Sequence, residues 1–175
     1  MSQKNIKVFS SIAIILFIAL EFWGMETLDA LSYAAAGAAL ADYCYDRFLW
    51  RYNPWEPTPR LYGSYNANGV SSHNGETTYQ SCVIITQRLS SISVLEILND
   101  ACCESVTANL TRHTPDGPWF LYYTYLTHPN HSDTDDMHYG TAIFQVREGG
   151  ILTGNYFTNR LKQTAGNMTL QRIKR

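Results

Sequence analysis

The stretch ILTGNYFTNR, residues 151–160, decides the fold that this sequence predicts. Its positions separate into two alternating sets, as expected for a β-strand, in which successive side chains point to opposite faces. One set is Leu152, Gly154, Tyr156, Thr158 and Arg160, and the other is Ile151, Thr153, Asn155, Phe157 and Asn159. Neither set is purely aliphatic, so whichever set faces the interior brings aromatic and polar side chains into it.

Similar short runs, separated by turn residues, fill the sequence beyond residue 60, and none shows a long helical period. Strands are predicted near residues 61–67, 77–88, 91–99, 103–112, 119–127, 138–147, 151–160 and 165–174. Eight evenly spaced strands in so short a segment favour a mainly β fold, a small antiparallel β-barrel, since closure leaves no exposed strand edge. A β-sandwich is the alternative.

Two apolar stretches precede the strands, from Val8 to Gly24 and from about Ala30 to Trp50. Each approaches the roughly 20 residues that cross a bilayer, and residues 25–29 between them suffice only for a tight turn. We therefore predict a two-helix transmembrane hairpin over residues 1–52, a Pro-rich linker over 53–60 and a barrel over 61–175. Each predicted helix includes one acid, Glu21 or Asp42, which either reaches water near an interface or faces a partner helix or a water-filled path.

The charges that flank the predicted helices set their orientation. Lys4 and Lys7 precede the first helix and Arg47 and Arg51 follow the second, which predicts that both termini are cytoplasmic. The competing interpretation is a cleaved signal peptide, but no small-residue cleavage site follows the apolar run. Three cysteines outside the anchor, an odd number, also do not suit a closed set of disulfides.

Composition excludes other classes of protein. The chain is 45% hydrophobic and 16% charged, which is typical of a folded protein and not of a disordered one. Its net charge of −2 argues against binding to polymeric nucleic acid, which favours basic proteins. The last residues differ from this average, because residues 160–175 hold five bases and no acid. This basic end suits an anionic ligand, a solvated surface or anionic lipid.

Candidate ligand-binding residues follow from strand alternation and side-chain chemistry. Inward-facing Tyr, Thr and Arg would line a polar, aromatic cavity suited to bases and phosphates. We predict that Arg160 and Thr158 contact phosphate and that Tyr156 and Tyr125 stack on a ligand or line its site. The second choices are Tyr62, Tyr79 and Arg88. The competing interpretation is that the tyrosines pack as ordinary core residues with their hydroxyls at the rim.

An enzymatic interpretation rests on the loop HPNHSDTDDMH, residues 128–138. Its potential metal ligands are His128, His131, Asp133, Asp135, Asp136 and His138. They all belong to one loop and lack the helical spacing of a zinc protease, so a solvated acidic loop is favoured. No nucleophile elbow, phosphate-binding loop or dinucleotide-binding glycine pattern is present. We therefore predict no catalytic residue, no metal and no cofactor.

Several motifs together resemble one known family. They are LYGSYNANG at 61–69, HYGT at 138–141, GNYFTNR at 154–160 and Gly166, behind two short helices and a Pro/Trp linker. The chain is similar to the two-transmembrane, β-strand-rich effectors associated with the nucleotidyltransferases of bacterial CBASS anti-phage systems. Of the candidate residues, the resemblance extends to Tyr156, Thr158 and Arg160.

The resemblance implies a receptor and not an enzyme. A cognate nucleotidyltransferase would make a cyclic dinucleotide, the barrel would bind it, and the effector would form homo-oligomers. Its helices would then disrupt the lipid of the cell inner membrane and kill the infected cell. The alternative function from a different class is an exported, lipocalin-like carrier of a small ligand, which requires the signal-peptide interpretation and an apolar cavity.

Overall fold

The structure is a computed structural model that describes residues 3–72, 77–99, 101–129, 137–160 and 163–173. The chain divides into two compact units. The first comprises residues 1–57 with residues 88–90, and the second comprises residues 58–87 and 91–175. The second unit contains all the strands of the barrel, and the predicted linker at 53–60 is shared between the two units.

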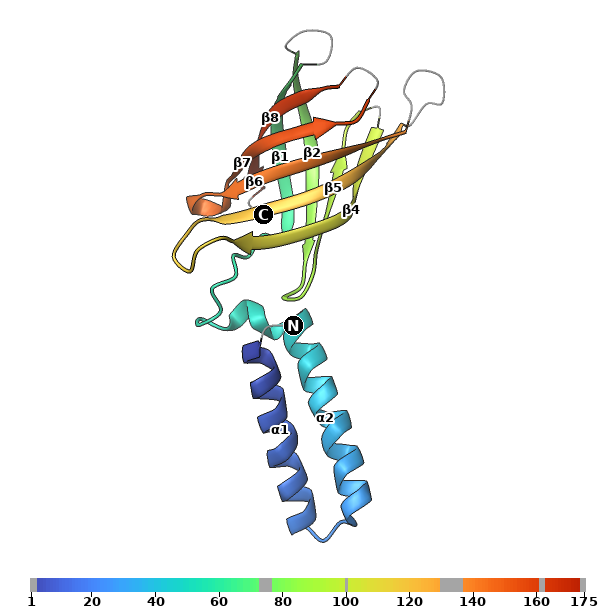
Figure 1. Ribbon diagram of the computed structural model, residues 1–175, viewed down its shortest axis with the longest axis vertical. Coiled ribbons are helices and arrows are strands. Elements are labelled where there is room, and N and C mark those ends of the chain that lie inside the picture. Colours follow the sequence, from blue (N-terminus) through green and yellow to red (C-terminus); the bar gives the residue numbers. More distant parts are fainter. Residues whose placement is uncertain (1–2, 73–76, 100, 130–136, 161–162, 174–175) are drawn as a thin grey trace. The chain divides into compact units, whose positions relative to one another are not determined.

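The first unit is a helical hairpin (Figure 1). Helix α1 (Gln3–Phe22) and helix α2 (Thr27–Arg47) are followed by a short 3-10 helix, η1 (Leu49–Tyr52). The turn between α1 and α2 contains Gly24 at φ 81°, a left-handed conformation that glycine adopts without strain. Small residues of α2 allow the close approach of α1. Ala30 and Ala34 are buried, and a Cβ at Gly37 would lie 3.1 Å from Leu16 Cδ1.

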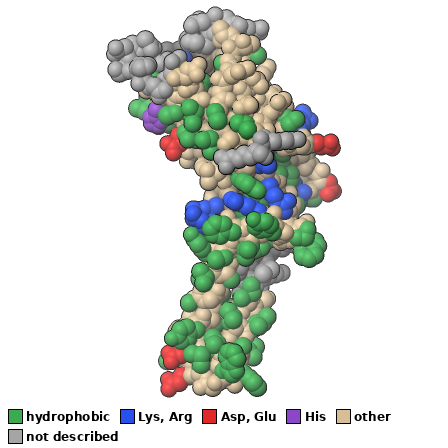
Figure 2. Space-filling view, turned by 180° about the vertical axis from the view of Figure 1, so that it is seen from behind, with side chains coloured by type: hydrophobic (Ala, Val, Ile, Leu, Met, Phe, Trp, Pro, Cys, Tyr) green, Lys and Arg blue, Asp and Glu red, His purple; other side chains and the backbone are tan. Residues whose placement is uncertain are grey.

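Among the described residues, no helix combines the length and the apolar character needed to cross a membrane. The predicted hairpin is therefore present as two packed helices, but the prediction that both span a membrane is not supported. In α2 the apolar character comes largely from alanine, whose small side chain contributes little apolar area. Glu21 is exposed near the end of α1, and Asp42 is half-buried in α2. Hydrophobic side chains nevertheless lie along the hairpin's surface (Figure 2).

The second unit is a closed eight-stranded antiparallel barrel, which confirms the predicted fold class and excludes the sandwich. The strands follow one another around the barrel in sequence order, and β1 pairs with β8 (Figure 1). Each predicted strand is present with its ends shifted by a few residues. The strands are β1 (Gly63–Ser71), β2 (Thr77–Gln87), β3 (Ile92–Ile97), β4 (Ala101–Arg112), β5 (Trp119–Pro129), β6 (His138–Val146), β7 (Leu152–Thr158) and β8 (Ala165–Arg172).

At one end of the barrel, which we call the base, hydrogen bonds hold the segment that leads into β1. The buried Gln87 side chain accepts the Leu61 N–H at 2.7 Å and donates to the Pro59 carbonyl at 2.9 Å. Arg172 of β8 donates to the carbonyl oxygens of Arg60 and Tyr62. These bonds satisfy backbone groups that would otherwise have to reach water, so they hold this segment in place at the base.

Candidate ligand-binding site

The barrel interior changes character along its axis. Near the base, Tyr65, Leu121, Phe144, Leu152 and Leu170 are all 0% exposed, so apolar side chains fill this part completely. The other end, which we call the polar end, is lined by side chains at the strand ends nearest residues 72–76, 98–100, 130–137 and 159–164. They are Ser71, Tyr79, Ser81, Glu96, Cys103, Tyr125, Thr127, His138, Tyr156, Thr158, Arg160 and Thr164.

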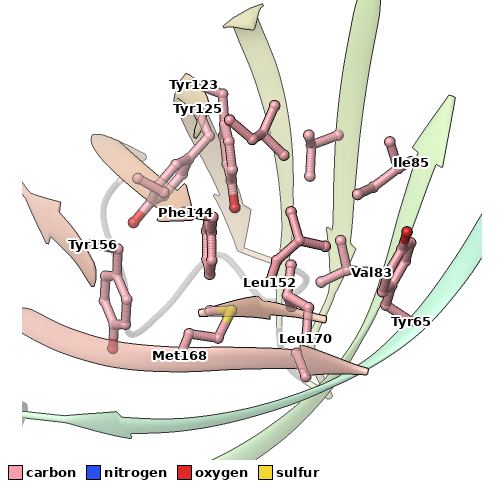
Figure 3. Packing of buried hydrophobic residues seen from close by; sticks show 14 of the residues in the cluster. Tyr65, Val83, Ile85, Tyr123, Tyr125, Phe144, Leu152, Tyr156, Met168 and Leu170 are labelled. Atoms are coloured by element: carbon pink, nitrogen blue, oxygen red, sulfur yellow. The ribbon is translucent and has the colours of Figure 1, made fainter. Parts of the chain in front are cut away.

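Solvent reaches the polar end slightly more than the base. Tyr125, Thr127, His138 and Tyr156 retain between 5% and 8% of their surface, whereas the five residues named near the base retain none. In Figure 3, Tyr125 and Tyr156 lie toward one side of the view, Leu152, Val83, Ile85 and Tyr65 lie toward the other, and Phe144 lies between the two groups. The polar end is therefore the part of the interior where a ligand would find hydrogen-bonding and aromatic groups.

Three tyrosines at this end each cover a glycine on a neighbouring strand. The register places Tyr79 opposite Gly69, Tyr125 opposite Gly140 and Tyr156 opposite Gly166. In each pair, a Cβ built on the glycine would collide with the tyrosine ring. The absence of a side chain therefore lets each ring lie against the backbone of the wall, an arrangement known to stabilise glycine in strands.

The tyrosine rings also contact one another across the interior. Tyr79 meets Tyr156 edge to face with ring centroids 6.2 Å apart, and Tyr123 stacks on Phe144 with centroids 6.0 Å apart. Burial raises the pKa of Tyr79, Tyr123 and Tyr125, and the nearby Glu96 carboxyl raises each further. These phenols therefore stay neutral and offer hydrogen-bonding hydroxyls beside their aromatic faces.

A second group of side chains forms a row around the wall, which we call the polar row. The register pairs Glu96 with Cys103, Cys103 with Thr127, and Thr127 with His138. Gly140 pairs with Thr158, so the row continues from His138 to Arg160, just beyond the end of β7. Arg160 Nε donates to His138 Nε2 at 3.1 Å. The row thus runs from an acid on β3 to a base after β7.

Cys103, in the middle of the polar row, is not an activated thiol. Its Sγ lies 3.3 Å from Thr127 Oγ1, and the side chain is buried. Burial raises the pKa of Cys103 to about 12, although the hydrogen bond with Thr127 and the charge of Arg160 oppose the shift. Because the thiolate is the nucleophile, Cys103 is unsuited to nucleophilic catalysis.

The residue before Arg160 on the same face, Thr158, fastens the turn that follows β7. Its hydroxyl lies 2.6 Å from the Thr164 hydroxyl and accepts the Thr164 N–H at 3.2 Å. Its own N–H donates to the Thr164 carbonyl at 2.9 Å. Thr158 therefore ties together the two ends of the connection that includes Arg160.

The structure brings five of the seven predicted ligand-binding residues to the polar end: Tyr79, Tyr125, Tyr156, Thr158 and Arg160. The other two lie elsewhere. Tyr62 is at the base, 39% exposed, with the Arg172 guanidinium 5.4 Å from its ring centroid. Arg88 follows β2 and belongs to the first unit.

Strand alternation did not reveal the acid of the polar row, Glu96, nor its partners Ser81 and Cys103. The sequence suggests His138 as a potential metal ligand, whereas in the structure it accepts a hydrogen bond from Arg160. The other residues of that hypothesis divide between His128, on β5, and His131, Asp133, Asp135 and Asp136, which lie outside the described residues. Within the described part of the chain, no group of three potential ligands could hold a metal ion.

Comparison with known proteins gives this barrel a family. No curated protein is significantly similar to the chain. The family model described as "Cap15, cyclic dinucleotide receptor domain" matches residues 56–172, about two thirds of the sequence and every strand of the barrel. Its members are receptors and not enzymes, which agrees with an interior that holds aromatic and hydrogen-bonding groups around an unactivated thiol. The chain belongs to the Cap15 cyclic dinucleotide receptor family.

Proposed function

We propose that the protein is a CBASS effector that binds a cyclic dinucleotide at the polar end of its barrel. The family match supports the class of ligand. The observation that carries the location is the convergence of Arg160 with Tyr79, Tyr125 and Tyr156 inside one end of the barrel. A cyclic dinucleotide carries two phosphates and two flat bases, and these side chains suit both parts.

Arg160 is the proposed phosphate contact. Its guanidinium is planar, always charged and able to donate two parallel hydrogen bonds to phosphate oxygens. The hydrogen bond to His138 fixes the position of Nε, and the Thr158–Thr164 contacts hold the turn in which Arg160 lies. In this proposal Thr158 acts by holding that turn, through the contacts of its hydroxyl with Thr164.

The tyrosines are the proposed base contacts. Because each ring lies against a glycine, one face is taken up by the wall and the ring is held in a fixed orientation. Stacking of a nucleobase on an aromatic side chain contributes about 1–3 kcal/mol per base and needs no particular base. A fixed ring also loses little conformational entropy when the ligand binds.

The carrier alternative is not favoured by the interior. A lipocalin-like carrier needs an apolar cavity, but the apolar part of this barrel is filled by side chains that are 0% exposed. The part that retains some exposure contains an arginine, a histidine, a glutamate and several tyrosines. These groups favour a polar, anionic ligand over an apolar one.

We place the protein at the inner membrane, with both termini cytoplasmic, and infer that its helical hairpin associates with lipid. Large apolar side chains on the hairpin are more than half exposed, including Ile14, Ile15, Ile18, Leu31 and Leu40. Such surface favours burial in lipid or in an assembly of several chains. Ligand binding would then promote homo-oligomers, and assembled hairpins would disrupt the membrane.

Lipid association and assembly have separate tests. The full-length protein should float with vesicles of phosphatidylethanolamine and phosphatidylglycerol, and the Ile15→Ser/Ile18→Ser variant should float less. Sedimentation velocity should show larger species when a cyclic dinucleotide is added. Equal flotation of the two proteins contradicts lipid association through these side chains. An unchanged sedimentation coefficient with bound ligand contradicts ligand-induced assembly.

The binding proposal is tested by thermal unfolding of the full-length protein with a panel of cyclic dinucleotides. A ligand at 100 times its Kd stabilises the folded state by about 2.7 kcal/mol, and each kcal/mol raises Tm by roughly 2–4 °C in a chain of this size. Arg160→Ala should remove most of the shift. Arg147→Ala is the matched control, because Arg147 is exposed and near the base. The absence of a shift with every member of the panel, or equal shifts in both variants, contradicts the proposal.

A further inference from the structure

Glu96 is an acid in an unusual position. It is 6% exposed and is the only buried carboxyl among the described residues. Its Oε1 accepts a hydrogen bond from Ser81 Oγ at 2.6 Å. Within the described part of the chain, that is the single hydrogen bond of this carboxyl, and no Lys or Arg forms an ion pair with it.

Such an arrangement is costly for the folded protein. A buried carboxyl normally has several hydrogen-bond partners or a cation, and an aliphatic side chain at this position would pack without penalty. Burial raises the pKa of Glu96, and the hydrogen bond from Ser81 only partly opposes this. The groups that face it are Tyr79, Tyr123, Tyr125 and Cys103, all of them neutral when buried. Buried polar groups with unused capacity are characteristic of binding sites.

The position of Glu96 relative to Arg160 suggests what the carboxyl binds. Glu96 lies on β3, and Arg160 follows β7, four strands away in a closed barrel of eight. The two side chains therefore belong to opposite walls of the same end. A ligand whose phosphates reach Arg160 would present other groups to Glu96, and in a cyclic dinucleotide those groups are the edges of the bases.

We propose that Glu96 recognises the Watson–Crick edge of a guanine, so that this receptor selects a guanine-containing cyclic dinucleotide. The inference rests on the proposed function. An ionised carboxylate accepts hydrogen bonds from both N1–H and N2–H of guanine. A protonated carboxyl accepts from N1–H and donates to O6. Guanine is thus complementary to Glu96 in either protonation state.

Adenine is complementary in one state only. Its Watson–Crick edge offers one donor, N6–H, and one acceptor, N1, so an ionised carboxylate leaves N1 facing a negative oxygen. A protonated carboxyl can pair with adenine, but adenine binding then requires Glu96 to keep its proton, whereas guanine binding does not. A site whose buried groups are left unpaired by the wrong ligand discriminates strongly against it.

The test compares cyclic di-GMP with cyclic di-AMP on the full-length protein by titration calorimetry at pH 7.5. The wild type should bind cyclic di-GMP at least tenfold more tightly. Glu96→Leu should weaken cyclic di-GMP at least tenfold, because a leucine side chain can neither accept N1–H of guanine nor donate to O6. Glu96→Gln should strengthen cyclic di-AMP and so narrow the preference, because an amide matches N6–H and N1 of adenine as well as N1–H and O6 of guanine. Glu104→Gln, on the same part of the sheet but exposed, is the matched control and should change neither.

Each result distinguishes the two claims. If the wild type binds both dinucleotides equally, or prefers cyclic di-AMP, the guanine inference is wrong while the receptor function stands. If Glu96→Leu binds cyclic di-GMP as the wild type does, Glu96 does not recognise the base. If the wild type binds no cyclic dinucleotide, the proposed function fails and the inference with it. Ser81→Ala removes the hydrogen bond to Glu96 but keeps the Glu96 carboxyl. An intermediate loss of the preference for cyclic di-GMP in this folded variant shows that the effect comes from base recognition and not from misfolding.

Discussion

The ring of Tyr125 covers Gly140, its partner in the register of β5 and β6, so closely that a methyl group at position 140 would collide with it. The same relationship holds for Tyr79 over Gly69 and for Tyr156 over Gly166. These three pairs lie on different parts of the wall at one end of the barrel. They give that end a set of aromatic surfaces whose orientation is fixed before a ligand arrives.

Replacement of Gly140 by alanine should therefore destabilise the barrel. We expect a loss of about 1–3 kcal/mol, the usual cost of overpacking a buried site. In the Tyr125→Ala background the same substitution should cost much less, because the ring that collides with the new methyl group is gone. Urea unfolding of the four proteins in this double-mutant cycle measures the coupling. An equal cost in both backgrounds would show that the ring does not cover Gly140.

The buried carboxyl of Glu96 predicts how stability depends on pH. Burial raises its pKa in the folded protein above the ordinary value of 4.5. Between the ordinary and the raised pKa, the unfolded chain has lost a proton that the folded chain keeps, so the free energy of unfolding falls as pH rises through this window.

Glu96→Gln should remove that contribution and raise Tm at pH 7 relative to the wild type without ligand. The expected increase is about 2–4 °C for each kcal/mol gained. Thermal unfolding between pH 4 and pH 8 measures both slopes, with Glu104→Gln as the control. A variant that is less stable than the wild type at pH 7 would mean that the ionised carboxyl stabilises the fold.

The base of the barrel depends on Arg172. Its guanidinium donates to two backbone carbonyl oxygens, of Arg60 and Tyr62, and lies over the rings of Tyr62 and Tyr65. Hydrogen bonds to a charged group contribute about 1.5–3 kcal/mol, so Arg172→Met should lower the free energy of unfolding by about that amount. Arg147→Met, which loses one hydrogen bond to Thr153 at the surface, should cost under about 0.5 kcal/mol. Similar losses in the two variants would contradict the role of Arg172.

Cysteine reactivity tests the burial of the polar row. Cys103 is buried with a pKa of about 12, whereas Cys82 and Cys102 are half-buried. At pH 8, iodoacetamide should modify Cys82 and Cys102 well before Cys103, because only the thiolate reacts. Mass spectrometry of peptides from the native protein gives the three rates. Modification of Cys103 as fast as Cys102 would show that the polar end is open to the reagent or that the thiol is activated.

Alternation along the strands was sufficient to predict much of the barrel. It placed Tyr156, Thr158 and Arg160 on one face of the strand predicted at 151–160, and in the structure this face of β7 is turned inward, with Arg160 just beyond the strand's end. Alternation does not show how far along the axis a residue lies, because this depends on the stagger between strands. For that reason alternation alone groups Tyr62 and Arg88 with Tyr79, although both lie away from the polar end.

Glu96 could not be found in the same way. Both faces of β3 carry apolar residues, Val94 beside Glu96 on one and Leu95 with Ile97 on the other, so the pattern does not mark which face is inward. An acid ordinarily indicates the solvent face, and here it is buried. The helical hairpin was predicted correctly from its apolar runs, but counting alanines as apolar overestimated the capacity of α2 to cross a membrane.

The central claim, that the polar end of the barrel is the cyclic dinucleotide site, is tested most directly by NMR of the full-length protein with ¹³C-labelled tyrosine rings. Single Tyr→Phe variants assign the ring signals, and cyclic di-GMP is then titrated in. The account predicts shifts for Tyr79, Tyr125 and Tyr156, with little change for Tyr62 at the base or for Tyr139, which is half exposed. Saturable binding that shifts Tyr62 or Tyr139 and leaves the three interior rings unchanged would contradict it.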